Sequence, residues 1–166
     1  MSLLEVVTLP GEILSRKASQ IAEIDDQIRD LAASMVELMY NSPGCVGLAA
    51  NQVGRSESLF VLDVSSHKKT TTGHGLVVML NPELIHVSDL ETMREGCMSV
   101  PDLTGDVKRA RSIVVRGQDL TGQAAVFETD GFEARAFQHE IDHLNGLLFI
   151  DRVDSPSGLH QRRRYL

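Results

Sequence analysis

One segment of this 166-residue chain constrains the fold more than any other, because between Asp130 and Gly146 it places His-Glu-x-x-His in a helical pattern. Asp130 and the glutamate at 133 have the form of a capping box, and Gly146 suits the end of a helix. On such a helix His139 and His143 project from one face about one turn apart, so a single metal ion can bind both. The sequence therefore predicts a helix that carries two ligands of a metal site.

Glu140, which directly follows the first histidine, is placed to act on a water bound to that ion. It is rotated by about 100° from His139 and about 60° from His143, so its carboxylate can approach the water without binding the metal. The ion lowers the pKa of its water toward about 7, and a nearby carboxylate takes and then returns the proton. A chance match to this pentapeptide is expected in roughly one chain of this length in a few hundred, so the motif alone is not sufficient.

A catalytic site of this kind usually has three protein ligands and one open position, so a third ligand is needed. The candidates are Cys97, Cys45, His160 and a carboxylate. Cys97 lies in REGCMSVPD, which reads as an irregular segment between strands, and a tight turn of this kind can present a thiolate. Because a buried cysteine is usually an inert small hydrophobe, the residues alone favour Cys97 and leave Cys45 open.

The composition excludes several classes of protein. The length suits a single domain with a hydrophobic core, and no apolar run approaches the roughly 18 to 20 residues that span a bilayer. The N-terminus has no basic leader, and two cysteines are too few for a disulfide framework. A net charge of −7 argues against broad nucleic-acid binding. We therefore expect a cytoplasmic protein with no membrane partner and no specific DNA partner.

The rest of the chain predicts one further helix and several strands. Residues 25–41 repeat apolar side chains at helical spacing, with Asp25 or Asp26 near the start and Ser42-Pro43-Gly44 at the end. Short segments rich in β-branched residues predict antiparallel-type strands at 59–64, 76–81, 83–87, 112–117 and 124–129. Residues 67–75 read as a polar loop, in which His67 and His74 face solvent.

A glycine-rich loop precedes the first of these strands. Gly44, Gly47 and Gly54 bracket small residues around one amide side chain, Gln52. Small residues allow a substrate backbone to approach closely, and a glutamine amide can donate a hydrogen bond to a developing oxyanion. A tight turn with an outward-facing glutamine is the simpler interpretation, so this loop alone is weak evidence.

Together, three segments resemble the peptide deformylase family, whose motifs follow one another in the same order. The segments are Cys45-Val-Gly-Leu-Ala-Ala-Asn-Gln52, Glu95-Gly-Cys-Met-Ser99 and Gln138-His-Glu-Ile-Asp-His-Leu144. The similarity extends from the early helix to about residue 152. It implies an α+β fold in which antiparallel strands surround the motif helix, with a further N-terminal helix. It also implies a single catalytic domain over 1–166, with a short basic tail from about 154.

The resemblance implies hydrolysis of the N-formyl group from the initiator formyl-methionine of nascent polypeptides, with release of formate. Cys97, His139 and His143 would then hold one divalent ion, which is Fe(II) natively, with Zn(II), Ni(II) or Co(II) as substitutes in preparations. Glu140 would act as general base and then acid, while Gln52 and the backbone N–H of Met98 would stabilise the oxyanion. The implied substrate-binding residues are Val46, Gly47, Glu95, Gly96, Phe132 and Ala136. The implied partners are N-formylmethionyl peptides and the ribosome near its exit tunnel, and a monomer is favoured.

The chain departs from the family at two positions that bear on function. Thr104 stands where many bacterial members have an arginine that helps to hold the peptide. Arg135 takes a position that is usually aliphatic. Either its aliphatic stem lines the methionine pocket while the charge reaches water, or the charge points inward, which would affect selectivity for methionine. These departures motivate an alternative function, a catalytically weak, deformylase-like protein that binds peptides or the ribosome.

Three further hypotheses concern the motif helix and the C-terminus. His-Glu-x-x-His also occurs in metallopeptidases, although a cysteine ligand fits that class poorly. A closed structural zinc site would need a fourth protein ligand. Arg162, Arg163 and Arg164 could dock the protein at the ribosome or form a solvated tail.

Overall fold

The computed structural model describes residues 3–162 of the chain. Its strands form one sheet in which every pair is antiparallel, in the order β1-β2-β3-β4-β5, with β6 paired to β4. The strands are β1 (Gly47–Ala49), β2 (Leu59–Leu62), β3 (Val77–Cys97), β4 (Val100–Gln118), β5 (Ala124–Asp130) and β6 (Leu159–Gln161).

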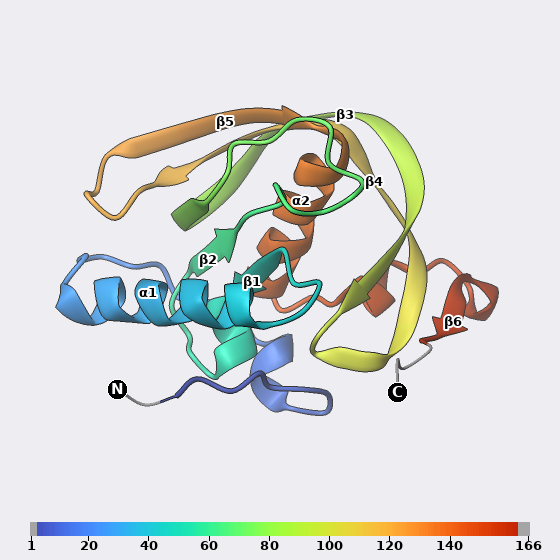
Figure 1. Ribbon diagram of the computed structural model, residues 1–166, viewed down its shortest axis with the longest axis horizontal. Coiled ribbons are helices and arrows are strands. Elements are labelled where there is room, and N and C mark those ends of the chain that lie inside the picture. The colour runs from blue at the N-terminus through green and yellow to red at the C-terminus, as the bar shows by residue number, and fades with distance from the viewer. Residues whose placement is uncertain (1–2, 163–166) are drawn as a thin grey trace.

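The motif helix α2 (Gly131–Leu144) passes through the middle of the molecule, with strands on either side of it (Figure 1). It contacts β1 and β2 on one side and β4 and β5 on the other. Phe137 is fully buried on this helix and packs edge-on against Phe60 of β2. Gly146 adopts a φ of +78°, a left-handed conformation that favours glycine, and so ends the helix where the sequence predicts.

The predicted capping box at the start of α2 is wrong. Asp130 is the N-cap residue, but its side chain makes no capping hydrogen bond. The Glu133 carboxylate instead accepts hydrogen bonds from the backbone N–H of His74 and the hydroxyl of Thr129, both at 2.7 Å. Glu133 is completely buried beneath the 67–75 loop, so tertiary packing determines its partners. His74 is therefore hydrogen-bonded to α2, where a free loop position was expected.

The hairpin of β3 and β4 is much longer than the predicted strands. The segments 76–81 and 83–87, predicted as two strands, are both parts of β3, and the strand continues to Cys97. The pairing register shifts between Leu80 and Glu83, so Pro82, which lacks an N–H, lies at an irregularity in the ladder. Cys97 is thus the last residue of a strand, which corrects the prediction of an irregular segment around it.

Helix α1 (Asp26–Asn41) begins at the predicted cap, since the Asp25 carboxylate accepts a hydrogen bond from Ile28 N at 3.0 Å. Its apolar stripe packs with β1 and β2 in a cluster that includes Met35, Leu48 and Val61, all fully buried. In Figure 1 this helix lies across the face of the molecule next to β1 and β2. The stripe is core, as its spacing indicates.

Short 3₁₀ helices connect the main elements: η1 (Glu12–Ser15), η2 (Ala50–Val53), η3 (Phe149–Arg152) and η4 (Pro156–Gly158). The segment predicted as a basic tail forms η4 and β6, and β6 pairs with β4 at Leu103–Gly105. The described part of that segment therefore belongs to the sheet, while Arg163 and Arg164 lie outside the described residues. Among the described helices, none combines the length and apolar character needed to cross a bilayer.

Candidate metal centre

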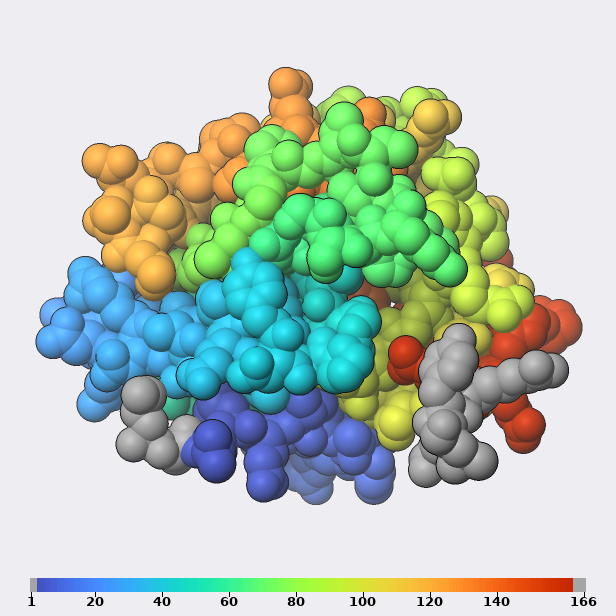
Figure 2. Space-filling view, in the orientation of Figure 1, coloured from blue at the N-terminus to red at the C-terminus, as the bar shows by residue number. Residues whose placement is uncertain are grey.

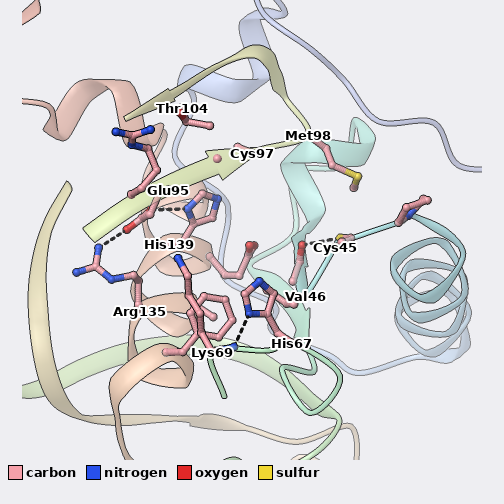
Figure 3. Close-up of a pocket in the computed structure, with 18 of the residues that line it drawn as sticks. Cys45, Val46, His67, Lys69, Glu95, Cys97, Met98, Thr104, Arg135 and His139 are labelled. Carbon is pink, nitrogen blue, oxygen red and sulfur yellow. Dashed lines mark hydrogen bonds and ion pairs between the residues drawn. The ribbon is translucent and has the colours of Figure 1, made fainter. Parts of the chain in front are cut away.

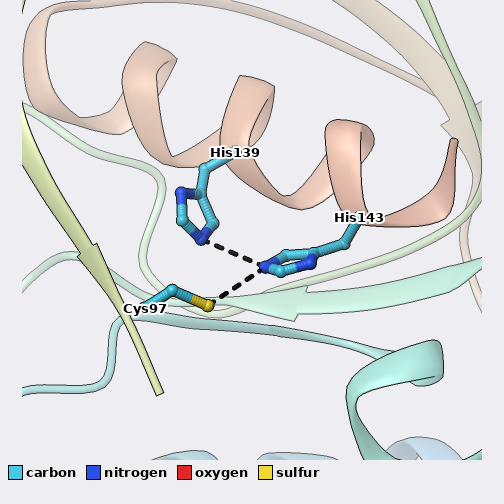
Figure 4. Close-up of side chains that lie close together, drawn as sticks. All are labelled: Cys97, His139 and His143. Carbon is cyan, nitrogen blue, oxygen red and sulfur yellow. Dashed lines mark hydrogen bonds between the residues drawn. The ribbon is translucent and has the colours of Figure 1, made fainter. Parts of the chain in front are cut away.

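Three potential ligands from two elements meet at the centre of the fold. Cys97 Sγ lies 3.3 Å from His143 Nε2, which lies 3.1 Å from His139 Nε2, and the three ligand atoms fall within 4.8 Å of one another. Figure 4 shows the sulfur at the end of β3 facing the two imidazoles on α2. Metal–ligand bonds of about 2.0–2.3 Å place the donor atoms of one ion roughly 3 to 4 Å apart. The two separations at His143 Nε2, 3.3 and 3.1 Å, lie in this range, so the three residues could hold one divalent ion.

The competing ligands lie elsewhere. The Cys45 thiol donates to the carbonyl of Gly47 at 3.2 Å, and burial, with the nearby Glu140 charge, raises its pKa to about 12. His160 Nε2 lies 3.0 Å from a carboxylate oxygen of Asp106. Within residues 3–162, no fourth histidine, cysteine or carboxylate joins the three ligands. The site therefore has the ligand number of a catalytic centre, and a closed structural zinc site is disfavoured.

Glu140 lies beside the three ligands and is almost completely buried. Its Oε2 atom has no hydrogen-bond partner among the described residues. Burial raises the pKa of this carboxyl to about 7, against the opposing charges of His139 and Arg109. Gly47 leaves room for it, since a Cβ there would lie only 3.0 Å from the Glu140 carboxyl carbon. The group can therefore accept and return a proton near neutral pH.

Gln52 presents its amide nitrogen to the same space. The side chain is held by η2, where its Oε1 accepts a hydrogen bond from Ala49 N at 3.0 Å. Its Nε2 then lies 3.4 Å from Cys97 Sγ and 3.1 Å from Ser99 Oγ. The carbonyl end is fixed by the backbone of Ala49, so the donor end points toward Ser99 and toward Cys97, which lines the cavity. This geometry replaces the outward-facing glutamine of the simpler interpretation.

Glu95 connects the metal ligands to a buried ionic network. Its Oε1 lies 2.8 Å from His139 Nδ1, which leaves Nε2 of that ring for a metal. Arg109 binds both Glu95 oxygens, at 2.6 and 2.9 Å, and bonds Asp142 Oδ2 at 2.7 Å. Burial alone would raise the pKa of Glu95, but the hydrogen bonds from His139 and Arg109 outweigh it and hold that pKa well below its usual range. The carboxylate therefore stays charged and orients the ligand.

Arg135 has the second of the two expected arrangements, in which its charge points inward, and the residue also lines the cavity into which the site opens. The residue is only 4% exposed, so its charge does not reach water. Its guanidinium donates to Glu95 at 2.7 Å and to the carbonyls of Val107 and Glu91 at 2.9 and 2.7 Å. A carboxylate and two carbonyls therefore compensate this charge inside the protein, and Figure 3 shows the side chain directed to Glu95. The Arg135 guanidinium is therefore a fixed part of the ionic network around Glu95.

The site opens into a cavity of about 270 Å³. Figure 2 shows its mouth as a hollow between the loop before β1, the 67–75 loop and the β3–β4 hairpin. Met98 also borders the cavity, near Cys97 and beside Cys45 and Val46 (Figure 3). All six residues expected to bind substrate line it: Val46, Gly47, Glu95, Gly96, Phe132 and Ala136.

The cavity is also lined by residues outside the predicted site. His67, expected in solvent, stacks on Phe132 with the ring centroids 4.2 Å apart. Lys69, Arg94 and Arg162 complete the rim. These residues come from segments far apart in the chain, and no local pattern marks them. The rim is rich in cations, in contrast to the net charge of −7 for the whole chain.

Comparison with known proteins identifies the family. A family model described as polypeptide deformylase matches residues 3–158. The chain belongs to the polypeptide deformylase family. The peptide deformylase of Syntrophobacter fumaroxidans is 44% identical over 154 residues, which cover 93% of this chain and 88% of that protein. The peptide deformylase of Halothermothrix orenii is also 44% identical, over 92% of this chain and 95% of that protein.

Solved deformylases have the same fold. The crystal structure of peptide deformylase from Thermotoga maritima matches with a TM-score of 0.84 and 35% identity, over 93% of this chain and all (100%) of that one. A peptide deformylase from Synechococcus elongatus, in complex with actinonin, matches with a TM-score of 0.84 and 36% identity, over 93% and 81% of the two chains. The predicted family and its α+β fold are confirmed, and the chain is a deformylase, a hydrolase of a metal-dependent family.

Proposed function

We propose that this deformylase removes the formyl group from the initiator methionine of nascent polypeptides, using one divalent ion held by Cys97, His139 and His143. The observation that carries the proposal is the convergence of one sulfur and two imidazole nitrogens beside a buried carboxylate, one oxygen of which has no partner within residues 3–162. When bound, the ion would act as a Lewis acid that makes water acidic enough to lose a proton near neutral pH.

Glu140 is the proposed proton carrier. Its carboxylate takes a proton from the attacking water while the water oxygen bonds to the formyl carbon. The same proton then goes to the amine nitrogen as the C–N bond breaks, so the products are formate and a free N-terminus. A base whose burial raises its pKa to about 7 suits both transfers.

Gln52 and Met98 are the proposed donors to the carbonyl oxygen on which negative charge develops. The buried amide nitrogen of Gln52 already lies 3.4 Å from Cys97 Sγ, and Met98 follows that cysteine directly along the cavity. Donors that are fixed before the reaction stabilise the transition state more than the ground state. The methionine side chain of the substrate would pack between Val46, Phe132 and Ala136.

A formate-release assay tests this function. Protein prepared anaerobically with Fe(II) should release formate from a formyl-Met peptide and should lose activity after treatment with a chelator. Restored activity on readdition of the metal, alongside a metal analysis, ties turnover to the ion. Peptide binding by calorimetry without formate release would instead support the binding protein, and cleavage of unformylated peptides would support a metallopeptidase.

The native metal is a separate proposal. A thiolate with two imidazoles would by itself suit zinc, whereas the family resemblance favours Fe(II). We propose Fe(II) natively, with Zn(II), Ni(II) or Co(II) replacing it in preparations, because a ferrous thiolate site is prone to oxidative loss. Comparing formate release by the four metal forms, prepared with and without air, would distinguish them.

The organisation of the protein in the cell is also proposed. Strand β3 contributes residues to all three buried clusters, which supports one catalytic domain over the whole chain. We propose a monomer that works in the cytoplasm, near the ribosomal exit tunnel. Light scattering tests whether the protein is a monomer, and cosedimentation tests whether it binds ribosomes. A charge reversal at Arg163 and Arg164 tests whether ribosome binding depends on these two arginines.

A further inference from the structure

Strand β6 carries an arginine to the mouth of the catalytic cavity. Thr104 of β4 pairs with His160, and the backbone N–H of Arg162 donates to the Asp102 carbonyl at 2.9 Å. The pairing of β6 with β4 fixes the backbone of Arg162, so that its side chain begins near the end of β3. Arg162 therefore lines the cavity although it lies 65 positions after Cys97.

The guanidinium of Arg162 lies against Gly96, the residue before the sulfur ligand. A Cβ placed on Gly96 would lie 3.6 Å from Arg162 Nη1 and 3.4 Å from Thr104 Cγ2. The two side chains thus occupy the same side of Gly96. Because the Thr104 side chain is short, the Arg162 guanidinium can also reach this side of Gly96.

Among the three arginines that line the cavity, Arg162 is the one whose guanidinium has no ion-pair partner within the described residues. Arg94 is paired with Asp106 at 3.1 Å, and the Arg135 guanidinium is held by Glu95 and two carbonyls. Within residues 3–162, no carboxylate lies within ion-pair distance of the Arg162 guanidinium, and the residue is exposed. A free guanidinium at a cavity mouth offers several N–H donors and no acceptor.

We propose that Arg162 binds a main-chain carbonyl oxygen of the peptide substrate, beyond the formylated residue. A substrate whose formyl group reaches Cys97 must leave the cavity past neighbouring Gly96, which has no side chain to obstruct it. Each extended residue advances about 3.3–3.6 Å, so the carbonyls that follow the first residue pass the rim. This inference rests on the proposed function, and it makes Arg162 a substrate-binding residue outside the three sequence motifs.

Steady-state kinetics on an amidated formyl-Met-Ala-Ser peptide test this role, because amidation removes the terminal carboxylate that could pair with any cation. In Arg162→Ala, KM should rise roughly tenfold with kcat unchanged, as expected for one lost hydrogen bond from a charged donor. Arg116→Ala is the matched control, because Arg116 is exposed and paired with Glu83 on the sheet. The unfolding midpoint of each variant verifies that it is folded.

A rescue variant makes the test specific to position. Since Thr104 reaches the same side of Gly96, the double variant Thr104→Arg with Arg162→Ala should recover most of the lost KM. An unchanged KM in Arg162→Ala, or an equal loss in Arg116→Ala, would overturn the proposal. So would a double variant that stays as weak as the single one.

Binding of the product peptide separates this proposal from the proposed function. Calorimetric titration of metal-loaded protein with amidated Met-Ala-Ser requires no turnover, and Arg162→Ala should weaken the affinity roughly tenfold. Wild-type protein that binds this peptide through Arg162 but releases no formate would refute the function and keep the inference. Equal affinity of wild type and Arg162→Ala would refute the inference, whatever the formate assay shows.

Discussion

The two long helices of this protein are buried in different ways. Helix α1 buries five residues, all apolar, along one stripe. Helix α2 buries eleven of its 14 residues, and six of them are polar or charged, so packing alone cannot specify it. The stripe on α1 gains its stability from the hydrophobic effect, whereas α2 needs a partner for nearly every polar group it buries.

Those partners come from all around α2. Glu133 is bonded to the 67–75 loop, Gln138 exchanges two hydrogen bonds with the backbone of Ala110, and Asp142 is paired with Arg109. Two buried atoms on this helix have no partner among the described residues: His143 Nδ1, on the ring whose Nε2 faces the other two ligands, and the carboxylate oxygen Glu140 Oε2. A buried polar atom without a partner calls for an explanation, and a proton-transfer role provides one. The comparison thus separates the polar groups that hold the fold from the Glu140 carboxylate, which is left for proton transfer, while His143 Nδ1 also lacks a partner among the described residues.

Replacing the Glu140 carboxylate should have the largest effect on activity. We expect Glu140→Gln to lower kcat/KM about 10²- to 10⁴-fold, the usual contribution of general acid–base catalysis, because an amide cannot carry the proton. The metal content should be unchanged, since the carboxylate is not among the ligands. Formate release and metal analysis measure both quantities, with the exposed Glu128→Gln as control. Activity within tenfold of wild type would remove Glu140 from the mechanism.

Breaking the buried ion pairs of Arg109 beside α2 should lower the free energy of unfolding. Arg109→Met leaves Glu95 and Asp142 without their shared cation, and losing one partner of a buried pair costs about 3–5 kcal/mol. Denaturant unfolding of protein loaded with one chosen metal measures the change. The control is Arg116→Met, whose exposed pair with Glu83 contributes about 0–1 kcal/mol. Equal losses for the two variants would contradict the distinction between buried and exposed pairs.

An apolar truncation on α1 tests the other side of the comparison. Met35 is fully buried in the cluster of α1, β1 and β2, so Met35→Ala should lower the free energy of unfolding by about 2–5 kcal/mol. At temperatures well below unfolding, kcat/KM should stay near the wild-type value, because the residue lies outside the catalytic cavity. Glu37→Ala, on the exposed face of the same helix, should change stability by no more than about 0.5 kcal/mol. A catalytic defect in Met35→Ala would show that α1 influences the site.

The same contrast explains what the sequence could and could not predict. The one-sided stripe of α1 produces a clear period, and the spacing of His139 and His143 on α2 follows from helix geometry alone. Cys97 was favoured from local chemistry and was assigned only through the family resemblance. The structure then places its sulfur 3.3 Å from His143 Nε2.

The missed features all depend on segments that meet only in the folded chain. The local pattern predicts a cap role for Glu133, but its buried carboxylate accepts a hydrogen bond from the backbone of the 67–75 loop. For Arg135 the sequence leaves open whether the charge reaches water or points inward, because its partners, Glu95 and two backbone carbonyls, lie on other elements. Arg162 reaches the site only because β6 pairs with β4. Local patterns predict helices and motifs, whereas such partnerships require the tertiary structure.

The N-caps of the two helices allow the finest test of the comparison. Asp25 accepts a hydrogen bond from Ile28 N at 3.0 Å, whereas the side chain of Asp130 makes no capping bond. Asp25→Ala should therefore cost about 1 kcal/mol of stability. Asp130→Ala should cost less, about 0.3–1 kcal/mol, because only the attraction of its charge to the helix dipole is lost. Denaturant unfolding in low salt and in high salt separates the two terms, since screening weakens the dipole term. If Asp130→Ala were the more costly variant, α2 would depend on its cap after all, and its start would not be set by tertiary contacts.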